Sequence, residues 1–395
     1  MSKQTGLNAQ SIGLHNTQKV FEIIRIEGPI SRIDIAEHLG LSKAAITAAV
    51  DRLLEKGLLL GKEDPEYKKV GPKPQLLSIK PDAALFVGID VGGTGIGYGI
   101  GNLDGKILSQ GWTQTGNTWE EVARQITEIF NSCDQWCDED PESVQAVGLS
   151  VPGVVDTKGQ VSFAPNIKGP DPFPIKSELE NRISVPIFVE NDVNLSALGE
   201  MNTEAARYTN LVFINIGTGI GAGVIINGEL YHGGLQHAGE IGWMLINRDD
   251  IDFETDGAMG SLEAKLTGPS LARRARQTLK EKTDGIPAID LDNITPKEVL
   301  KHSQDYPELR SVQEDWLEEW SIVLNNLAAI LDPQLMVLGG GVSQSFTEQI
   351  IDKLRDNLQS TTQRPPKLML SPDPKKAPLR GATELCLAEF SQWFS

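Results

Sequence analysis

Two segments of the sequence repeat one pattern, and this repeat constrains the fold more than any other feature. DVGGTGIGYGIGNLDGKIL begins at Asp90, and NIGTGIGAGVIINGELYHG begins at Asn215. Each reads as a strand, a turn of glycine and threonine, a second strand, and a hairpin closed by Asp-Gly or Asn-Gly, which suit the positive φ angles of a tight turn. The repeat, spaced by about 125 residues, predicts two similar lobes with a cleft between them.

The two glycine turns can hold phosphate. Because glycine has no Cβ, the backbone N–H groups of such turns can approach phosphate oxygens closely. One glycine turn alone is weak evidence, since glycine bends are common in sheets, but two at matching places favour a phosphate site. The later segment LDPQLMVLGGGVSQS adds a strand and a triple-glycine turn.

A polar cluster follows a strand between the two repeats. VPIFVENDVNLSALGE predicts a strand over 187–189 and a helix that starts near Val193. Glu190, Asn191 and Asp192 lie at the exit of that strand. Asp192, beside a helix N-terminus, is where a base or a ligand-binding carboxylate would be mounted.

The first 80 residues read as a winged helix. NTQKVFEIIRIEG has a helical apolar stripe that stops at Gly28-Pro29, and SRIDIAEHLG predicts a second helix from N-cap Ser31 to Gly40. LSKAAITAAVDRLLEKGLL predicts a third helix from N-cap Ser42, so the last two form a helix-turn-helix. LLLGKEDPEYKKVGPKPQLLSI then reads as strand, charged turn and strand, which is a wing.

The third helix would enter the major groove, with its first residues at the base edges. Small alanine side chains can contact thymine methyls, and lysines suit phosphates or the minor groove. The alternative is a small helical domain that contacts protein. The DNA-binding candidates are Ser42, Lys43, Ala44, Ala45 and Thr47 on the helix and Lys68, Lys69 and Lys73 on the wing.

Charge is divided unevenly along the chain. Residues 1–80 carry 12 basic and 9 acidic residues, whereas the remainder carries 24 basic and 45 acidic ones, within a total of −18. A DNA-reading head needs local positive potential rather than a positive total.

The three cysteines are too few for a disulfide framework and are interpreted as ordinary thiols. No signal segment or membrane-spanning run is found, so a cytoplasmic protein is expected.

With these motifs in place, residues 84–395 resemble the ROK family (repressors, open reading frames, kinases), whose fold is that of sugar kinases and actin-like ATPases. The family's first and second phosphate turns resemble DVGGT and GTGIGAGVIINGEL, and its catalytic-Asp segment resembles VENDVNLSALGE. Its sugar-binding segment resembles HAGEIGWM, and its adenosine-side turn resembles VLGGGV. The resemblance covers essentially the whole chain, because the family's repressors carry a winged head.

The resemblance implies an α/β fold in three parts. A winged helix-turn-helix domain would occupy residues 1–80, the first ROK lobe residues 84–200 with 380–395, and the second lobe residues 201–379. The nucleotide site is interpreted as vestigial. Its residues by position are Asp90, Gly92, Gly93, Thr94, Gly217, Thr218, Gly219, Gly339 and Gly340.

The resemblance also implies a sugar site. Carboxylates and amides supply the donors and acceptors in fixed directions that sugar hydroxyls need. In a kinase, Asp192 would also take the proton from the attacking hydroxyl, and Asp90 would lie near magnesium and the phosphates. The residues carried over by position are Asn166, Asn191, Asp192, Glu240 and Glu263.

The chain departs from the family at its zinc loop. The family's histidine, which binds zinc and touches the sugar, is Trp243 here, and the three cysteine ligands are Glu254, Asp256 and Ser261. Structural zinc needs thiolates and imidazole, so we predict that no zinc is bound. The carboxylates would suit a hard metal such as calcium better, but Trp is no ligand.

Trp243 has two readings. Its ring could lie against the apolar face of a pyranose and belong to the sugar site, or it could fill the space of the missing metal site. We expect the loop to be held by packing around Trp243, Met244 and Met259. A second departure is Gly95, where kinase members commonly have Lys; the change removes a phosphate-neutralising charge without forbidding catalysis.

These features predict a transcriptional regulator, most simply a repressor of carbohydrate uptake or catabolism genes. A monosaccharide or related sugar bound between the lobes would change the lobe angle and the spacing of two heads. A homodimer is the smallest assembly expected to read a two-fold site in double-stranded operator DNA, and a tetramer would also agree with these features. The alternatives are an ATP-dependent sugar kinase with a DNA-binding head and a scaffold that senses a transport component. No cofactor is expected, neither zinc nor Mg-ATP, and no membrane partner.

Overall fold

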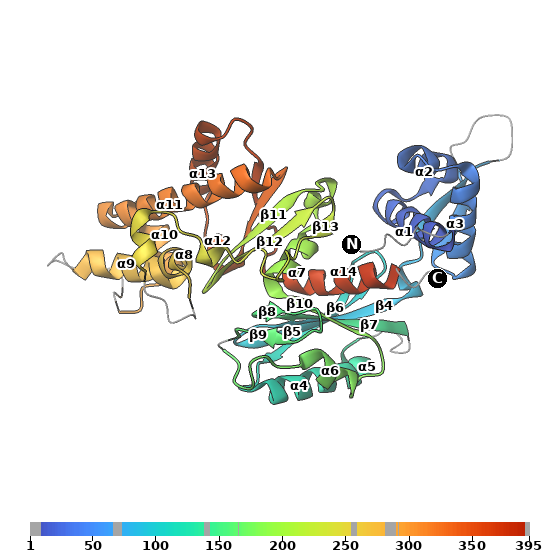
Figure 1. Ribbon diagram of the computed structural model, residues 1–395, viewed down its shortest axis with the longest axis horizontal. Coiled ribbons are helices and arrows are strands. Elements are labelled where there is room, and N and C mark those ends of the chain that lie inside the picture. The colour runs from blue at the N-terminus through green and yellow to red at the C-terminus, as the bar shows by residue number, and fades with distance from the viewer. Residues whose placement is uncertain are drawn as a thin grey trace, which may run out of the picture. The chain divides into compact units, whose positions relative to one another are not determined.

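The computed structural model describes residues 9–65, 73–137, 143–164, 166–253, 259–280, 290 and 292–391 (Figure 1). The chain divides into two compact units. The first contains Met1–Ser150, Asn166–Val189 and Ala382–Ser395, and the second contains Val151–Pro165 and Glu190–Gly381. The N-terminal head therefore belongs to the same compact unit as the first sheet of the body.

The head is a winged helix, as predicted. Its last two helices form the helix-turn-helix, and β2 and β3 form the antiparallel hairpin of the wing, with β1 on the other side of β3. The elements are α1 (Ala9–Glu27), β1 (Ile30–Ser31), α2 (Arg32–Leu39), α3 (Lys43–Glu55), β2 (Leu59–Glu63) and β3 (Gln75–Ile79).

The predicted caps set the helix ends of the head. The Ser31 hydroxyl accepts a hydrogen bond from the Asp34 N–H at the start of α2, and Gly40 ends this helix with φ 62°. The Ser42 hydroxyl accepts one from the Ala45 N–H at the start of α3. These caps satisfy backbone donors that the first turn of a helix leaves without partners.

The core of the head continues into the body. Val20, Phe21 and Ile24 on α1 belong to one buried cluster with Phe86 of β4 (Leu85–Val91) and Leu387 of α14 (Ala377–Ser391). Apolar packing therefore joins the head to the first sheet and to α14, and an ion pair between Arg25 and Glu384 also joins it to α14.

The first sheet has the strand order β10-β7-β4-β5-β6. β4 and β5 form an antiparallel hairpin, and β4 and β7 pair in parallel. α4 (Trp119–Asn131) and α6 (Ile175–Glu180) cover one face, and α14 lies on the other (Figure 1). The remaining strands are β5 (Gly95–Asn102), β6 (Ile107–Gln114), β7 (Val144–Val151) and β10 (Ile187–Asn191), and α5 (Cys133–Trp136) follows α4.

The second sheet repeats this topology in the order β13-β12-β11-β14-β15, which confirms the duplication expected from the sequence. β11 and β12 again form an antiparallel hairpin, and β14 pairs with β11 in parallel. The hairpin turns adopt positive φ at Gly105, Asn227 and Gly228. The strands are β11 (Leu211–Ile216), β12 (Ile220–Ile226), β13 (Glu229–Leu230), β14 (Leu335–Gly339) and β15 (Lys367–Leu370).

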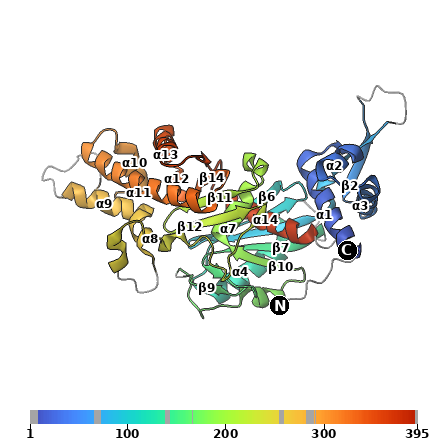
Figure 2. The ribbon, with the colours of Figure 1, turned by 45° about the horizontal axis from the view of Figure 1, so that its top comes forward.

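Helices enclose the second sheet. One large core forms between the sheet and the helices that Figure 2 shows lying together, among them α9, α10 and α11. α7 (Asp192–Glu200) packs against the sheet in a separate cluster around Phe213 and Ile225. The other helices are α8 (Ser261–Leu266), α9 (Gly268–Lys280), α10 (Pro296–His302), α11 (Pro307–Leu331), α12 (Gly340–Ser343) and α13 (Glu348–Thr361).

Candidate functional site

The predicted DNA-binding residues of α3 lie on its accessible face. Recognition helices contact bases through their first turns, so this face is the candidate DNA interface. Ser42, Lys43, Ala44 and Thr47 are exposed and Ala45 is half-buried. The opposite face, with Ile46, Ala49, Val50 and Leu53, is buried.

α2 holds α3 in place through Arg32. The guanidinium donates to the Asp51 carboxylate at 2.8 Å and to the Thr47 carbonyl at 3.5 Å. On the wing, Lys73 is exposed just before β3, where it can reach a phosphate. Lys68 and Lys69 lie outside the described residues.

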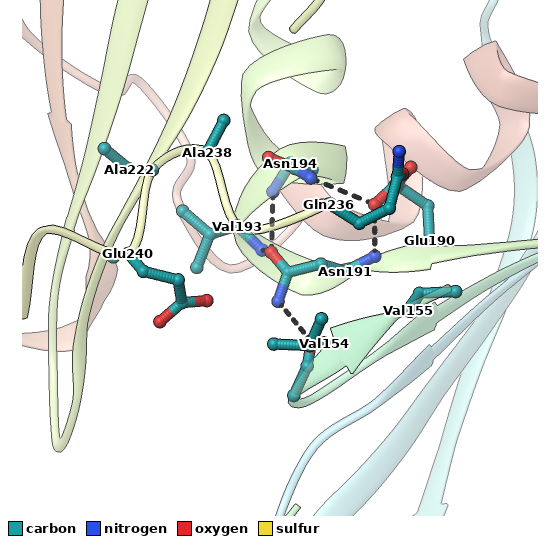
Figure 3. Close-up of a pocket in the computed structure, with 13 residues that line it drawn as sticks. Val154, Val155, Glu190, Asn191, Val193, Asn194, Ala222, Gln236, Ala238 and Glu240 are labelled. Atoms are coloured by element: carbon teal, nitrogen blue, oxygen red, sulfur yellow. Dashed lines mark hydrogen bonds between the residues drawn. The ribbon is translucent and has the colours of Figure 1, made fainter. Parts of the chain in front are cut away.

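The second unit contains a small polar hollow at the start of α7 (Figure 3). Its volume, 30 Å³, is about that of one water molecule, so the hollow by itself is too small to enclose a sugar. The lining residues are Gly153, Val154, Val155, Glu190, Asn191, Val193, Asn194, Gly221, Ala222, Gln236, Ala238, Gly239 and Glu240.

Asn191 joins two walls of the hollow. Its Oδ1 caps α7 by accepting the N–H groups of Val193 at 2.9 Å and Asn194 at 3.0 Å. Its Nδ2 donates to the Gly153 carbonyl at 2.8 Å, as the dashed lines in Figure 3 show. The amide orientation is therefore fixed from both sides.

Glu190 orders the polar groups around Asn191. Its Oε1 accepts the Asn191 N–H at 2.8 Å and the Asn194 Nδ2 at 3.0 Å. Its Oε2 lies 2.7 Å from Nε2 of His232, and this hydrogen bond raises the pKa of His232. Glu190 was predicted to lie at the exit of the strand, but it was not among the predicted site residues.

Asp192 is the first residue of α7, next to the hollow but outside its lining. Its Oδ1 accepts the Val193 N–H at 2.9 Å and the Asn191 Nδ2 at 3.1 Å. The positive end of the helix dipole favours the ionised carboxylate here. An ionised carboxylate can accept hydrogen bonds from sugar hydroxyls.

Two further carboxylates of the predicted sugar site lie in the second unit. Glu240 lines the hollow, and burial raises its pKa. Glu263 lies against the second glycine turn, where its Oε1 accepts the Ile220 N–H at 3.2 Å. Burial raises the pKa of Glu263 as well, and the negative charge of Glu240 adds to that rise.

The packing predicted for the family's zinc loop is found at one of its three residues. Trp243 and Met259 are 47% and 43% exposed. Only Met244 of the three packs against the core. Glu254 and Asp256 lie outside the described residues, whereas Ser261 is buried at the first turn of α8.

Asp250 ties this segment to α8 instead. Its buried carboxylate pairs with the Lys265 ammonium and accepts the N–H groups of Ile246 at 2.8 Å and Asn247 at 3.0 Å. Burial by itself raises the pKa of Asp250, but these partners outweigh it and lower the pKa to about 2. Sequence reasoning missed this pair, because a single Asp and a single Lys carry no motif.

The first unit holds Asn166, the remaining residue of the predicted sugar site, and the first glycine turn. The amide of Asn166 lies against Gly93 of the first turn, so close that a Cβ on Gly93 would be 3.1 Å from Nδ2. At the end of β4, Asp90 Oδ1 accepts a hydrogen bond from the Ser150 hydroxyl at 2.6 Å. Burial raises the pKa of Asp90 to about 6.

Trp112 covers the position at which kinase members have a lysine. A Cβ on Gly95 would lie 2.2 Å from Nε1 of Trp112, whose side chain is 66% exposed. A larger residue at position 95 would displace this ring. Neither glycine patterns nor charge pointed to Trp112, which pairs across the strands with Gly97.

The second glycine turn and the triple-glycine turn meet within the second unit. The Gly217 carbonyl accepts the Gly268 N–H at 2.9 Å at the start of α9. Gly340 has φ 84°, and a Cβ there would lie 2.5 Å from Oδ1 of Asn215. Only glycine fits this position of the predicted triple-glycine turn.

Comparison with known proteins agrees with this arrangement. The ROK family model matches residues 86–389, and the MarR family model matches residues 18–70. Over 334 residues the chain is 27% identical to the xylose repressor of Caldicellulosiruptor bescii, with 83% of each protein covered.

Two solved structures show the same fold. A ROK family transcriptional regulator described as a homologue of the E. coli MLC protein superposes over 97% of this chain and 98% of that one, with a TM-score of 0.80 and 20% identity. A ROK family glucokinase from Streptomyces griseus, in complex with glucose and AMPPNP, is 29% identical, with a TM-score of 0.63 over 76% of this chain and 99% of that one.

Fold and site together define a protein with a MarR-type winged helix on a body of the sugar-kinase, actin-like ATPase class. The chain belongs to the ROK family. Among the described helices, none has the length and apolar character that crossing a bilayer requires.

Proposed function

We propose that this protein is a sugar-responsive transcriptional repressor. α3 and the wing bind operator DNA, and the polar residues at the start of α7 bind a monosaccharide that weakens this binding. The observation that supports the proposal most is the presence in one chain of an exposed recognition helix and an ordered set of amide and carboxylate side chains. Its similarity to a xylose repressor over 83% of the chain supports the same conclusion.

α7 offers a route by which sugar binding reaches the rest of the protein. Its N-terminus carries Asp192, and its C-terminal half packs backbone to backbone against the start of α14. A Cβ on Gly199 would lie 2.0 Å from the Ala377 carbonyl oxygen, and one on Gly381 would lie 1.8 Å from the Leu195 carbonyl oxygen. A shift of α7 therefore has to move the start of α14.

Helix α14 also reaches the head. Ala377–Gly381 belong to the second unit, and the following residues of α14 belong to the first. There Glu384 pairs with Arg25 of α1, and Leu387 packs in the head core. We propose that sugar binding at the start of α7 changes the position of α14 and with it the orientation of the head. The proposal requires only that the sugar bind the two arrangements with different affinity.

A homodimer is the proposed DNA-binding form. A single winged helix contacts few phosphates, whereas two heads on a two-fold operator double the contacts and add a spacing requirement. A change in head orientation then weakens binding because both heads no longer fit their half-sites.

DNA binding in the presence of sugars tests the proposal. Operator sequences are first selected from random DNA with the full chain, and fluorescence anisotropy then measures affinity with and without D-xylose, D-glucose or N-acetylglucosamine. We expect one sugar to weaken specific binding at least tenfold and to raise the melting temperature in proportion to its concentration. Selection of no specific sequence, or equal affinity with every sugar, would contradict the proposal.

A sugar kinase with a DNA-binding head is the second candidate. The presence of Asp192 at the N-terminus of α7 and the similarity to a glucokinase favour it. A coupled ADP-release assay with ATP and the same sugars tests it. Turnover that Asp192→Asn abolishes would establish the kinase.

We propose further that the fold needs no zinc, because Asp250 and Lys265 hold the segment that zinc orders in the family. Metal analysis of purified protein and melting with and without EDTA test this. We expect less than 0.1 equivalent of zinc, as an order of magnitude, and an unchanged melting temperature.

A further inference from the structure

A second hollow lies on the helical side of the second unit, away from the residues discussed above. Its volume is 470 Å³, within the range of small-molecule sites, which is roughly 300–1,000 Å³. Its walls come from α10, α11, α13 and the segment that follows α12, and Figure 2 shows the first three helices near one another. The residues that line it include none of the glycines of the three turns and none of the predicted sugar-binding residues.

The walls are strongly basic. Lys297 and Lys301 lie one turn apart on α10, Arg310 lies on α11 and Lys353 on α13, whereas Glu314 is the only carboxylate among the lining residues. The whole chain carries a net charge of −18. Four cations around one hollow therefore stand apart from the rest of the molecule, and a concave surface concentrates their field.

Three acids on the helices of the walls are engaged with groups other than these cations. On α13, Glu348 and Asp352 both pair with Arg355, at 2.7 and 2.9 Å. On α10, Glu298 is held by the capping box with Thr295. Among the described residues, Lys297, Lys301 and Lys353 have no ion-pair partner within 4.0 Å.

Arg310 is fixed in place by the wall itself. Its Nη2 donates to the Gln304 carbonyl at 2.6 Å and its Nε to the Ser303 carbonyl at 3.4 Å. The Gln304 side chain in turn donates to Oε1 of Gln349 at 2.5 Å, which bridges the end of α10 to α13. The guanidinium is therefore held by neutral partners, and its charge remains available to an anion.

Gln313, in the wall of the hollow, carries an acceptor atom without a donor. Oε1 of Gln313 is buried and has no hydrogen-bond partner among the described residues. An unpaired buried acceptor is unfavourable, so a hydroxyl or amino group that reaches it and donates to it would bind favourably. Leu300, Leu317 and Ile350 supply an apolar floor beside it.

We propose that this basic cavity binds a phosphorylated small molecule as a second ligand. The lysines and Arg310 contact the phosphate, Gln313 accepts a hydrogen bond from a hydroxyl or amino group, and the organic part lies on the apolar floor. Sugar phosphates and nucleotides share this chemistry, and both carry a phosphate, a donor group and a partly apolar ring. The site is separate from the proposed sugar site and does not depend on it.

Isothermal titration of the full chain with inorganic phosphate, D-glucose, glucose 6-phosphate and ATP tests the proposal. The variants are the double substitution Lys301→Gln with Lys353→Gln, the charge-retaining double substitution of both residues to Arg, and Gln313→Leu. Lys106→Gln with Lys158→Gln removes two exposed lysines elsewhere and is the matched control. Because the substituted lysines of the cavity are exposed or half-buried, the fold is expected to survive.

We expect glucose 6-phosphate or ATP to bind with a Kd below about 1 mM, free glucose not to compete, and added salt to weaken binding. The Gln double variant should weaken binding at least tenfold, the Arg double variant less than threefold, and the control pair not at all. Which of the two compounds binds distinguishes a sugar phosphate from a nucleotide. Failure of every phosphorylated compound to bind, or equal binding by wild type and the Gln double variant, overturns the proposal. Neither result bears on operator binding.

Discussion

The guanidinium of Arg25 in α1 is paired with the carboxylate of Glu384 in α14, two residues 359 positions apart in the sequence. Arg25 Nη1 lies 3.2 Å from Oε1 and 3.1 Å from Oε2, and the two side chains are only 15% and 10% exposed. Burial raises the pKa of Glu384, and the charge of Arg25 opposes that rise. The pair therefore joins the DNA-binding head to the C-terminal helix in surroundings where a lone charge is unfavourable.

Removing one partner of this pair should uncouple the head from α14. Glu384→Gln leaves Arg25 with Glu22 alone and should destabilise the first unit by about 3 kcal/mol. In anisotropy titrations, the ratio of operator affinities without and with sugar should fall toward one, while sugar still raises the melting temperature. Arg274→Gln, which breaks the Arg274–Glu319 pair of the second unit, is the control and should leave the ratio unchanged. An unaltered ratio in Glu384→Gln would show that the pair plays no part in coupling.

Gly381→Ala should disturb the contact between α7 and α14. The new Cβ would overlap the Leu195 carbonyl, so the helices must separate. We expect a loss of about 2 kcal/mol or more in the free energy of unfolding and a weaker sugar response. Gly13→Ala is a matched helical control, because a Cβ there meets nothing within 4 Å, and it should be neutral or slightly stabilising. Equal behaviour of the two variants would rule out the tight contact.

Asp192→Asn should separate sugar sensing from DNA binding. The amide keeps an oxygen for the Val193 N–H but loses the charge that receives sugar hydroxyls. We expect sugar affinity, measured by thermal shift, to fall at least tenfold, with operator affinity without sugar within twofold of wild type. Loss of operator binding by a normally folded Asp192→Asn would contradict the assignment of the two functions to two parts of the chain.

The Asp250–Lys265 pair should make a large contribution to the second unit at neutral pH. Because the pKa of Asp250 is about 2 in the folded state, below its ordinary 3.8, its contribution is present above about pH 4 and is lost as pH falls toward 2. Asp250→Asn should cost about 3 kcal/mol at pH 7 by urea unfolding. The double variant with Lys265→Met should lose less than the sum of the single changes. Additive losses would mean that the two residues act independently.

The stability of Asp90→Asn, compared with that of the wild type at the same pH, should rise as pH rises. The folded-state pKa of Asp90, about 6, lies above its ordinary 3.8, so the folded state binds this proton more tightly. The contribution of Asp90 to the free energy of unfolding of the wild type is therefore fully present below about pH 4, and it is lost as pH rises through 6. We expect the variant's melting temperature, relative to wild type, to rise by about 2–4 °C between pH 4.5 and 7.5. Glu229→Gln, at an exposed position, is the control for the loss of one carboxylate. A constant difference for Asp90→Asn would refute the raised pKa.

Local signals were enough to predict the head and the repeat. Ser31, Gly40 and Ser42 act within a few residues of themselves, so caps and turns could be located in the sequence and are found where predicted. The strand–turn–strand repeat likewise predicted the second sheet with the topology of the first. Both depend on backbone hydrogen bonds and side-chain periodicity, which neighbouring residues determine.

The partners of distant residues were decided by the tertiary structure alone. His232 reaches Glu190, Trp112 covers Gly95, Lys265 pairs with Asp250, and the cations of the basic cavity meet from three helices. No spacing rule links such residues, because the packing of elements far apart in the chain brings them together. For the same reason the sequence left two readings of Trp243 open, because whether a loop position is covered depends on what packs over it.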